Sequence, residues 1–128
     1  MQTVIDQVPF YPGRAPIDAY GNGGFRFAGM SHRGSIICLP SGISAWDPVR
    51  LEDLSLQAFA KVLLERSEIA VLLLGTGLEL RHPGVEVRSG LAEAGIGVEP
   101  MDTGAACRTY NILLAEGRPI AAALLAVD

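Results

Sequence analysis

GIGVEPMDTGAACRTYN, residues 95–111, contains a turn, a short strand and the start of a helix in direct succession. Gly95 suits the position that follows a helix, and residues 97–101 have the length and apolar content of a short strand. Asp102 or Thr103 is a good N-cap, because its side-chain oxygen accepts a hydrogen bond from a free N–H of the first turn. The stretch therefore predicts a strand that leads directly into a capped helix, which is the repeating step of an α/β fold.

The neighbouring segments repeat this alternation in both directions. On the N-terminal side, residues 69–74 are continuously apolar, as in a strand covered on both faces, and residues 84–94 form a weaker helical pattern. On the C-terminal side, Gly117 ends the capped helix, and residues 120–127 form an alanine-rich strand that is narrow enough to lie beneath a helix. Strands that alternate with helices favour a sheet with helices on both sides.

The first half of the chain has the pattern of short antiparallel strands. Residues 1–16 contain three prolines, which lack the N–H that a strand ladder needs, so we expect an extended N-terminal arm laid across the surface. The next elements are expected to be a hairpin of residues 17–20 and 25–28 around the turn 21–24, and a second turn over residues 31–34. A strand over residues 35–39 and a loop over residues 41–49 are expected to follow. After the loop we expect a surface helix that is capped by Ser55 and that buries Leu56, Phe59, Ala60 and Leu63. We therefore predict a single three-layer α/β domain over residues 17–128, with a mixed β-sheet flanked by helices and with N-terminal antiparallel hairpins.

The composition excludes several classes of protein. Of the 128 residues, 49% are hydrophobic and 19% are charged, which is enough apolar material for one core and is compatible with a homodimer. The formal net charge is −4, without the basic stripe that binding to a nucleic acid needs. The N-terminus lacks a signal-peptide pattern, and the apolar runs are far shorter than the roughly 20 residues that cross a bilayer. We expect a cytoplasmic protein that is not integral to a membrane.

One glycine-rich turn invites a nucleotide-binding interpretation. Gly75-Thr76-Gly77 follows an apolar strand, but Leu80 stands where a dinucleotide-binding loop needs its third glycine, and no capped helix follows at once. We interpret the segment as a turn at a strand end. It remains a candidate wall of a ligand pocket, because open α/β sheets bind ligands at the carboxyl ends of their strands.

The other side chains with catalytic or metal-binding chemistry are isolated. His32 and His82 each stand alone in turn-like segments, which predicts solvated loop residues rather than metal ligands. Cys38 and Cys107 fall in apolar patterns and are interpreted as small core residues without a disulfide. The Gly-Xaa-Ser-Xaa-Gly pattern of serine hydrolases is missing as well. We expect no catalytic residue, no metal and no cofactor.

The last helix separates its side chains into two groups. At about 100° per residue, Ala106, Cys107 and Tyr110 lie on one buried stripe, whereas Arg108 and Asn111 share a different face. Arginine supplies a rigid fork of donors, and asparagine adds a donor and an acceptor. Together with the free N–H groups of the first turn, these side chains suit an anion or a carboxylate.

Two interpretations of the polar residues stay open. In the first, they bind a small molecule or an anion, and Glu99 or Asp102 acts as the base if a reaction occurs. In the second, which we favour, they brace the structure: Arg108 pairs with one of these carboxylates, and Asn111 satisfies backbone groups of a neighbouring loop. The ligand-binding candidates of the first interpretation are Gly75, Thr76, Gly77, Glu99, Asp102, Thr103, Arg108 and Asn111.

Five separated blocks of the sequence form a pattern that occurs in a known family. They are residues 95–103 (GIGVEPMDT), 105–114 (AACRTYNILL), 116–118 (EGR), 20–26 (YGNGGFR) and 74–77 (LGTG), together with Gly34-Ser35 and Trp46. With these blocks, the chain resembles the family called domain of unknown function 498 from about residue 17 to residue 127.

The resemblance implies a compact domain with a mixed sheet between helices. The family consists mostly of uncharacterised bacterial and archaeal proteins, includes a mitochondrial assembly factor of respiratory complex I, and offers no established catalytic residues. It implies an interaction or assembly factor without catalytic activity, whose partners are proteins such as respiratory-complex subunits. The alternative is a small-molecule or anion-binding domain, with or without enzymatic activity, that has a pocket near Arg108 and Asn111. The first function is expected to need an exposed apolar patch, and the second a pocket on which the polar side chains converge.

Overall fold

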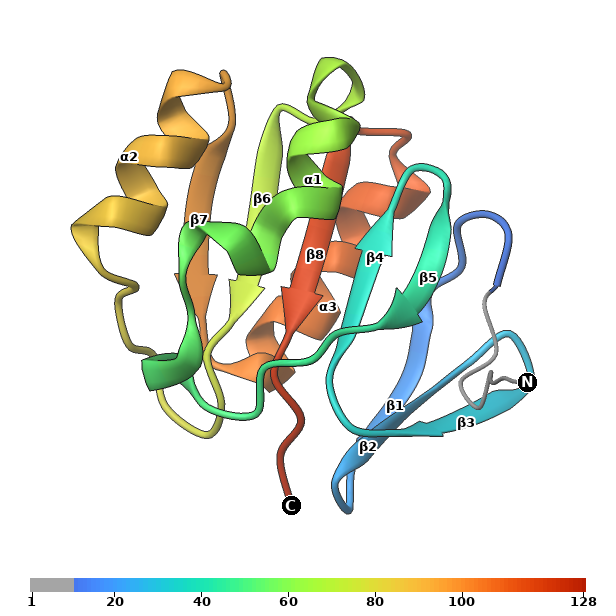
Figure 1. Ribbon diagram of the computed structural model, residues 1–128. Coiled ribbons are helices and arrows are strands. Elements are labelled where there is room, and N and C mark those ends of the chain that lie inside the picture. Colours follow the sequence, from blue (N-terminus) through green and yellow to red (C-terminus); the bar gives the residue numbers. More distant parts are fainter. Residues whose placement is uncertain (1–10) are drawn as a thin grey trace, which may run out of the picture.

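The computed structural model describes residues 11–128, which fold into two β-sheets and three α-helices (Figure 1). The strands are β1 (Ile17–Gly21), β2 (Gly24–Phe27), β3 (Met30–Arg33), β4 (Ile36–Leu39), β5 (Gly42–Ala45), β6 (Val71–Gly75), β7 (Gly97–Met101) and β8 (Ile120–Leu124). The α-helices are α1 (Ala60–Leu64), α2 (Val85–Glu93) and α3 (Thr103–Ala115), and 3-10 helices cover Leu51–Asp53, Leu56–Phe59 and Arg66–Glu68. Residues 1–10 of the expected arm lie outside the described residues, and the division into an arm and a domain stays a prediction.

The larger sheet runs through the centre of the molecule with the strand order β5-β4-β8-β6-β7. β6 pairs in parallel with both β7 and β8, whereas β4 pairs antiparallel with β8 and with β5. The parallel strands are joined through α2 and α3, because parallel neighbours cannot be linked by a tight turn. β1, β2 and β3 form the separate antiparallel sheet. As a result, the carboxyl ends of β6, β7 and β8 meet at one end of the larger sheet.

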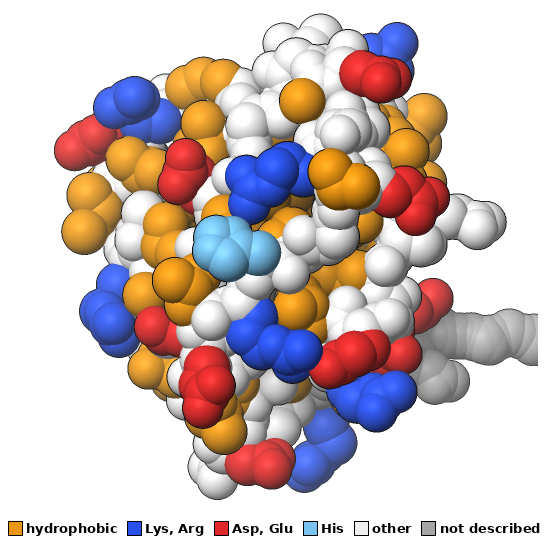
Figure 2. All heavy atoms as spheres, turned by 90° about the vertical axis from the view of Figure 1, so that its left-hand side faces the viewer, with side chains coloured by type: hydrophobic (Ala, Val, Ile, Leu, Met, Phe, Trp, Pro, Cys, Tyr) orange, Lys and Arg blue, Asp and Glu red, His pale blue; other side chains and the backbone are white. Residues whose placement is uncertain are grey.

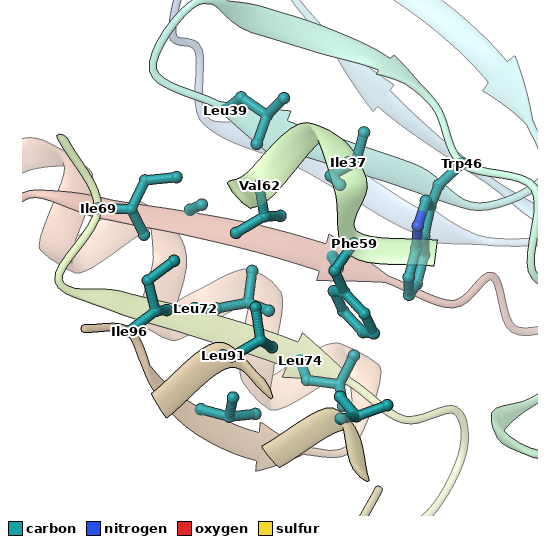
Figure 3. Packing of buried hydrophobic residues seen from close by; sticks show 14 of the residues in the cluster. Ile37, Leu39, Trp46, Phe59, Val62, Ile69, Leu72, Leu74, Leu91 and Ile96 are labelled. Carbon is teal, nitrogen blue, oxygen red and sulfur yellow. The ribbon is translucent and has the colours of Figure 1, made fainter. Parts of the chain in front are cut away.

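Each face of the larger sheet is covered by a different layer. α1 and α2 cover one face, here called the α1–α2 face, where the rings of Trp46 and Phe59 lie 5.5 Å apart between their centroids (Figure 3). α3 and the three-stranded sheet cover the other, the α3 face. β8 contributes to both cores by alternation: Ala121 and Ala123 belong to the first, and Ala122 belongs to the second. These small side chains allow a layer to pack closely on either side.

This architecture confirms the predicted three-layer α/β domain with a mixed sheet and N-terminal hairpins. β6, α2, β7 and α3 lie where the sequence places them, and Gly95 and Gly117 follow the two helices with φ of 85° and 72°. The first hairpin turns at Asn22 and Gly23, which both have a positive φ, as a two-residue type I′ turn requires. The last strand is shorter than expected, because β8 ends at Leu124.

The expected turn over residues 31–34 is wrong. Most of these residues belong to β3, and the chain turns earlier, at Ala28 and Gly29, with φ of 51° and 76°. The sequence pattern does not indicate this turn because alanine rarely adopts a positive φ. His32, expected to be solvated, is instead buried in β3, and its Nε2 lies 3.3 Å from the carbonyl oxygen of Ser35.

The expected loop over residues 41–49 is also wrong in part, because it contains β5. Every residue of β5 pairs antiparallel with a residue of β4, which is a strongly apolar strand. Only Ile43 gives β5 the β-branched character of a strand. The pairing with β4 therefore imposes a strand that the local sequence does not predict.

The helix expected after Ser55 begins in a different geometry. Leu56–Phe59 is a 3-10 turn, the chain becomes α-helical only at Ala60, and the Ser55 side chain makes no capping bond. A 3-10 turn advances by about 120° per residue instead of about 100°, so the buried face shifts. Val62 is therefore buried, whereas Ala60, expected in the core, is exposed.

β7 is the outer strand of the larger sheet, and its free edge is short of hydrogen-bond donors. Gly97 donates its N–H to the carbonyl of Ala70 (3.0 Å), so every second residue from Gly97 onward faces β6. Val98 and Pro100 therefore face the free edge, where proline has no N–H to offer. A proline in this position discourages another strand from pairing with the edge.

Candidate functional site

Buried hydroxyl groups tie the carboxyl ends of the parallel strands together. Thr103, the first residue of α3, is fully buried. Its Oγ1 donates to the carbonyl of Leu125 (2.7 Å) and accepts from the N–H of Gly77 (3.0 Å), while its own N–H donates to the Gly77 carbonyl (2.8 Å). We call Thr76, Gly77, Thr103 and Leu125 the carboxyl-end cluster. Thr103 joins the segments that follow β6 and β8 to the start of α3.

The second hydroxyl of the cluster folds the start of the connection between β6 and α2. Thr76 Oγ1 lies 2.6 Å and 3.0 Å from the carbonyl oxygens of Glu79 and Met101. The same oxygen accepts from the N–H of Arg81 (3.1 Å), and the N–H of Thr76 donates to the Met101 carbonyl (2.8 Å). Both threonines are therefore satisfied by backbone groups of the protein itself.

The two residues that flank Thr103 in space have structural roles as well. Asp102 is the N-cap of α3, and its Oδ1 accepts from the N–H of Ala105 (2.9 Å), which settles the choice between the two predicted caps. At Gly75, a Cβ would lie 3.1 Å and 3.2 Å from Oγ1 and Cα of Thr103. Glycine therefore lets the start of α3 lie directly against the end of β6.

Asn111 braces α3 against β1. Its Nδ2 donates to the carbonyl of Ile17 (2.9 Å), and its Oδ1 accepts from the N–H of Ile17 (2.8 Å). One carboxamide therefore satisfies both backbone groups of a strand residue, as a neighbouring strand would. This contact confirms a bracing role for Asn111, but its partner is the first residue of β1 and not a loop as expected.

The other two charged candidates lie at the surface. Arg108 and Glu99 are both exposed, and no ion pair within residues 11–128 involves Arg108. The expected pairing of Arg108 with Glu99 or Asp102 is therefore wrong. The structure gathers Gly75, Thr76, Gly77, Asp102 and Thr103 at the carboxyl ends of the strands and leaves Glu99, Arg108 and Asn111 apart from them. Ligand binding by these eight residues stays a prediction.

The interior behind α3 holds ionisable groups in their neutral forms. Burial raises the pKa of the Cys107 thiol to about 12, and it also raises the pKa of the Cys38 thiol and of the Tyr110 hydroxyl above their ordinary ranges. Both cysteines are buried and free, as the sequence predicts. Protonated thiols that are closed off from solvent are poor nucleophiles.

Metal-binding clusters and membrane-spanning helices are missing from residues 11–128. No group of three His, Cys, Asp or Glu side chains there is placed to hold a metal ion. No helix in this part of the chain combines the length and apolar character that crossing a membrane requires. One cavity of about 660 Å³ lies beside α1 and another of about 400 Å³ lies near Arg14 and Arg118. Neither cavity is lined by any of the eight predicted residues.

The connection directly after Gly77 and the first residue of α2 carry exposed apolar side chains. Leu78 and Val85 are each 78% exposed, and Leu80 is 55% exposed. We call these three side chains the apolar loop surface. On the side of the molecule that carries α2, apolar side chains lie between charged ones (Figure 2). An ion pair of Arg81 with Glu52 (2.9 Å) is part of this charged surround, and its hydrogen bond holds the pKa of the Glu52 carboxyl below the usual range.

The apolar loop surface was not among the candidate residues from the sequence. Leu78 and Leu80 belong to no helical or strand pattern, and they lie in a loop bounded by Gly77 and Pro83. Apolar residues between such turn signals, with no periodic partner, are the signal that would have identified the surface.

Comparison with known proteins gives one family and several relatives. A family model described as "Protein of unknown function (DUF498/DUF598)" matches residues 17–125. An uncharacterized protein of Rhodobacter capsulatus is 38% identical over 118 residues, which are 91% of this chain and 89% of that protein. The protein of Danio rerio named NADH dehydrogenase (ubiquinone) 1 alpha subcomplex assembly factor 3 is 37% identical over 109 residues, which are 85% of this chain and 63% of that protein. This chain therefore spans less than two thirds of the length of that relative.

One solved structure is particularly similar. It is a crystal structure from Bartonella henselae, described as that of an outer membrane protein, with 56% sequence identity and a TM-score of 0.89. The match covers 92% of this chain and 99% of that one. The same fold therefore occurs in a protein with more than half of its aligned residues identical.

Proposed function

The chain belongs to the DUF498/DUF598 family of proteins of unknown function, and on this basis we propose that it is an assembly or interaction factor that binds partner proteins and catalyses no reaction. Subunits of respiratory complex I are the candidate partners. A cytoplasmic location and a homodimer remain predictions from the sequence.

The observation that carries this proposal is the similarity to animal proteins named as assembly factor 3 of the NADH dehydrogenase alpha subcomplex. The similarity covers 85% of this chain but only about three fifths of those relatives, so it concerns the domain that this chain shares with them. An assembly factor needs a surface for a partner and needs no reactive centre. The threonine side chains near the carboxyl ends of the strands form hydrogen bonds with the protein backbone. A structural role of this kind is consistent with a protein that needs no reactive centre.

The apolar loop surface is the proposed docking site. Leu78 and Leu80 expose apolar area that the fold itself does not cover. Full burial of one leucine side chain against a partner contributes about 1.5–3 kcal/mol, so two leucines supply a useful part of a binding energy. The charged side chains around them favour correct orientation of the partner more than affinity.

Affinity purification with the full chain tests the proposal. Tagged protein is mixed with an extract of its source cells and with purified complex I subunits, and bound proteins are identified by mass spectrometry. The double variant Leu78→Ser/Leu80→Ser is compared with Leu64→Ser, which removes a leucine of α1 that is 83% exposed, more than Leu78 or Leu80.

We expect complex I subunits to bind the original chain and the Leu64→Ser variant and to be lost with the double variant. Absence of any reproducible protein partner for the original chain would contradict the assembly role. Equal binding of complex I subunits by all three proteins would show that the docking site does not include Leu78 and Leu80.

A further inference from the structure

The loop between β6 and α2 lacks the backbone hydrogen bonds of a regular element. Within residues 11–128, no backbone group of residues 78–82 bonds to another backbone group. Two of their backbone groups are nevertheless paired, and both pair with the same atom, Oγ1 of Thr76. The Glu79 carbonyl lies 2.6 Å from this oxygen, and the Arg81 N–H donates to it over 3.1 Å. The conformation of the loop therefore depends on one hydroxyl group.

The Thr76 hydroxyl can serve both groups at once. We assign its hydrogen to the Glu79 carbonyl, which is nearer than the Met101 carbonyl (3.0 Å) and has no other partner within residues 11–128. The hydroxyl oxygen then accepts the Arg81 N–H with a lone pair. Thr76 itself is only 4% exposed, and its own N–H bonds to Met101 of β7 (2.8 Å). The hydroxyl is therefore a fixed point to which the loop is attached.

The two groups held by Thr76 belong to the neighbours of Leu80. Glu79 precedes Leu80 and Arg81 follows it, so the backbone is held on both sides of this leucine. The Arg81 side chain adds an attachment to another segment through its ion pair with Glu52 (2.9 Å). A movement of Leu80 toward the protein surface would strain or break these contacts. Its side chain accordingly stays 55% exposed.

Leu78 is restrained in the same way. Gly77, which precedes it, exchanges two hydrogen bonds with Thr103: Oγ1 accepts the Gly77 N–H (3.0 Å), and the Thr103 N–H donates to the Gly77 carbonyl (2.8 Å). Glu79, which follows it, is held by Thr76. A free loop would turn such leucines toward the nearest apolar surface, because their burial is favourable. The hydrogen bonds of the neighbouring backbone oppose this movement.

We infer that Thr76 is a positioning residue of the docking site, whose hydroxyl holds Leu78 and Leu80 in the exposed conformation that a partner protein binds. This inference rests on the proposed function, in which the two leucines contact the partner. A loop that is fixed before binding loses less conformational freedom when the complex forms, so its affinity is higher. Thr76 acts through the loop and does not contact the partner, because its own side chain is buried.

The first test measures the order of the loop without any partner. Thr76→Val keeps the shape of the side chain and removes the hydroxyl. We expect the backbone order parameters of Leu78 and Leu80, from nitrogen-15 relaxation, to fall from about 0.85 to below about 0.6. Thr76→Ser keeps the hydroxyl and should retain the original values, as should Thr109→Val, which makes the matched change on α3. Unchanged order parameters in Thr76→Val would overturn the inference.

The second test measures docking, with purified complex I subunits as the probe. Capture is titrated at a temperature at which thermal melts show that all variants are folded. We expect an apparent affinity about tenfold or more weaker for Thr76→Val, and original affinity for Thr76→Ser and Thr109→Val. Rescue by serine separates the hydroxyl from a general packing role of the side chain. An equal loss with serine and valine would overturn the inference.

Two further outcomes distinguish this inference from the proposed function. Absence of capture by the original chain would contradict the proposed function and the docking role of Thr76 together. Capture that is equally strong for the original chain and for Thr76→Val, while Leu78 and Leu80 become mobile, would overturn only the positioning role. The proposed function would then stand without it.

Discussion

The carboxyl-end cluster and the apolar loop surface are adjacent in the chain, yet they have opposite surroundings. Gly77 belongs to the cluster, in which the threonine side chains are buried and hydrogen-bonded to the protein backbone. Leu78 is the next residue and exposes most of an apolar side chain to water. Burial of polar groups and exposure of apolar ones both cost free energy, but only the first cost is recovered inside the fold.

This contrast separates residues that build the fold from residues that are free for function. Thr76 and Thr103 have the polarity expected of a binding site, and their hydrogen bonds explain them without a ligand. Leu78 and Leu80 have no catalytic chemistry, and nothing within the described chain explains their exposure. The exposure of Leu78 and Leu80, and not the polarity of the buried threonines, is therefore the feature that supports the proposed docking site.

Among the variants that probe this contrast, loss of the Thr103 hydroxyl should cause the largest decrease in the free energy of unfolding. Thr103→Val keeps the shape of the side chain but leaves the Gly77 N–H and the Leu125 carbonyl without a partner, so we expect a loss of about 2–4 kcal/mol in the free energy of unfolding. Urea denaturation measures it. Thr109→Val on the same helix, where the half-buried side chain makes no hydrogen bond in the described structure, is the matched control and should change stability by less than about 0.5 kcal/mol.

Removal of the brace at Asn111 should be the next largest change. Asn111→Ala loses both hydrogen bonds to Ile17, and we expect a loss of about 1–2 kcal/mol. Arg108→Ala, one turn earlier on the helix, removes an exposed side chain and should stay within about 0.5 kcal/mol of the original protein. A loss of more than about 1 kcal/mol in the free energy of unfolding with Arg108→Ala would show that Arg108 and Asn111 stabilise the fold together.

A rise to alkaline pH should lower the free energy of unfolding through the buried Cys107 thiol, by less than the two preceding substitutions at their upper limits. The Cys107 thiol has an ordinary pKa of 9.0 and a folded-state pKa of about 12, so between these values the unfolded chain loses a proton that the folded chain keeps. The stabilisation from this group is complete below pH 9 and falls as the pH rises toward 12. We expect unfolding at pH 10 to need about 1 kcal/mol less than at pH 8 on account of this group. Cys107→Ala should show a correspondingly smaller decline in urea midpoints, and an identical decline would contradict the assignment.

The smallest change in stability is expected at the apolar loop surface. Leu80→Ser replaces an exposed leucine, so the free energy of unfolding should change by less than about 0.5 kcal/mol. Calorimetry of the single variant checks this value. A clear loss of stability would mean that Leu80 supports the fold and would remove it from the docking site.

The sequence predicts the second half of the fold better than the first. Residues from 69 onward carry strong local signals, such as the apolar run of β6, the cap at Asp102 or Thr103 and the glycines after α2 and α3, and the strands and helices of this half were predicted. β5 was missed because its pairing with β4, and not its own residues, makes it a strand. The turn at Ala28 was missed because it needs a positive φ at a residue that disfavours one.

The candidate site shows a similar division. The sequence narrowed the cap of α3 to Asp102 or Thr103 and predicted Asn111 as a brace, because these functions depend on local spacing or on a single side chain. It could not show that Thr103 reaches Leu125 or that Leu78 remains exposed. Both facts depend on which segments meet in space after the chain has folded.

Pro100 on the outer edge of β7 has a consequence for self-association. A second molecule that approached this edge would find no N–H at Pro100, so extension of the sheet from one molecule to the next is discouraged there. At this edge, the fold thereby discourages strand pairing between molecules without covering the exposed apolar side chains of the connection that follows β6.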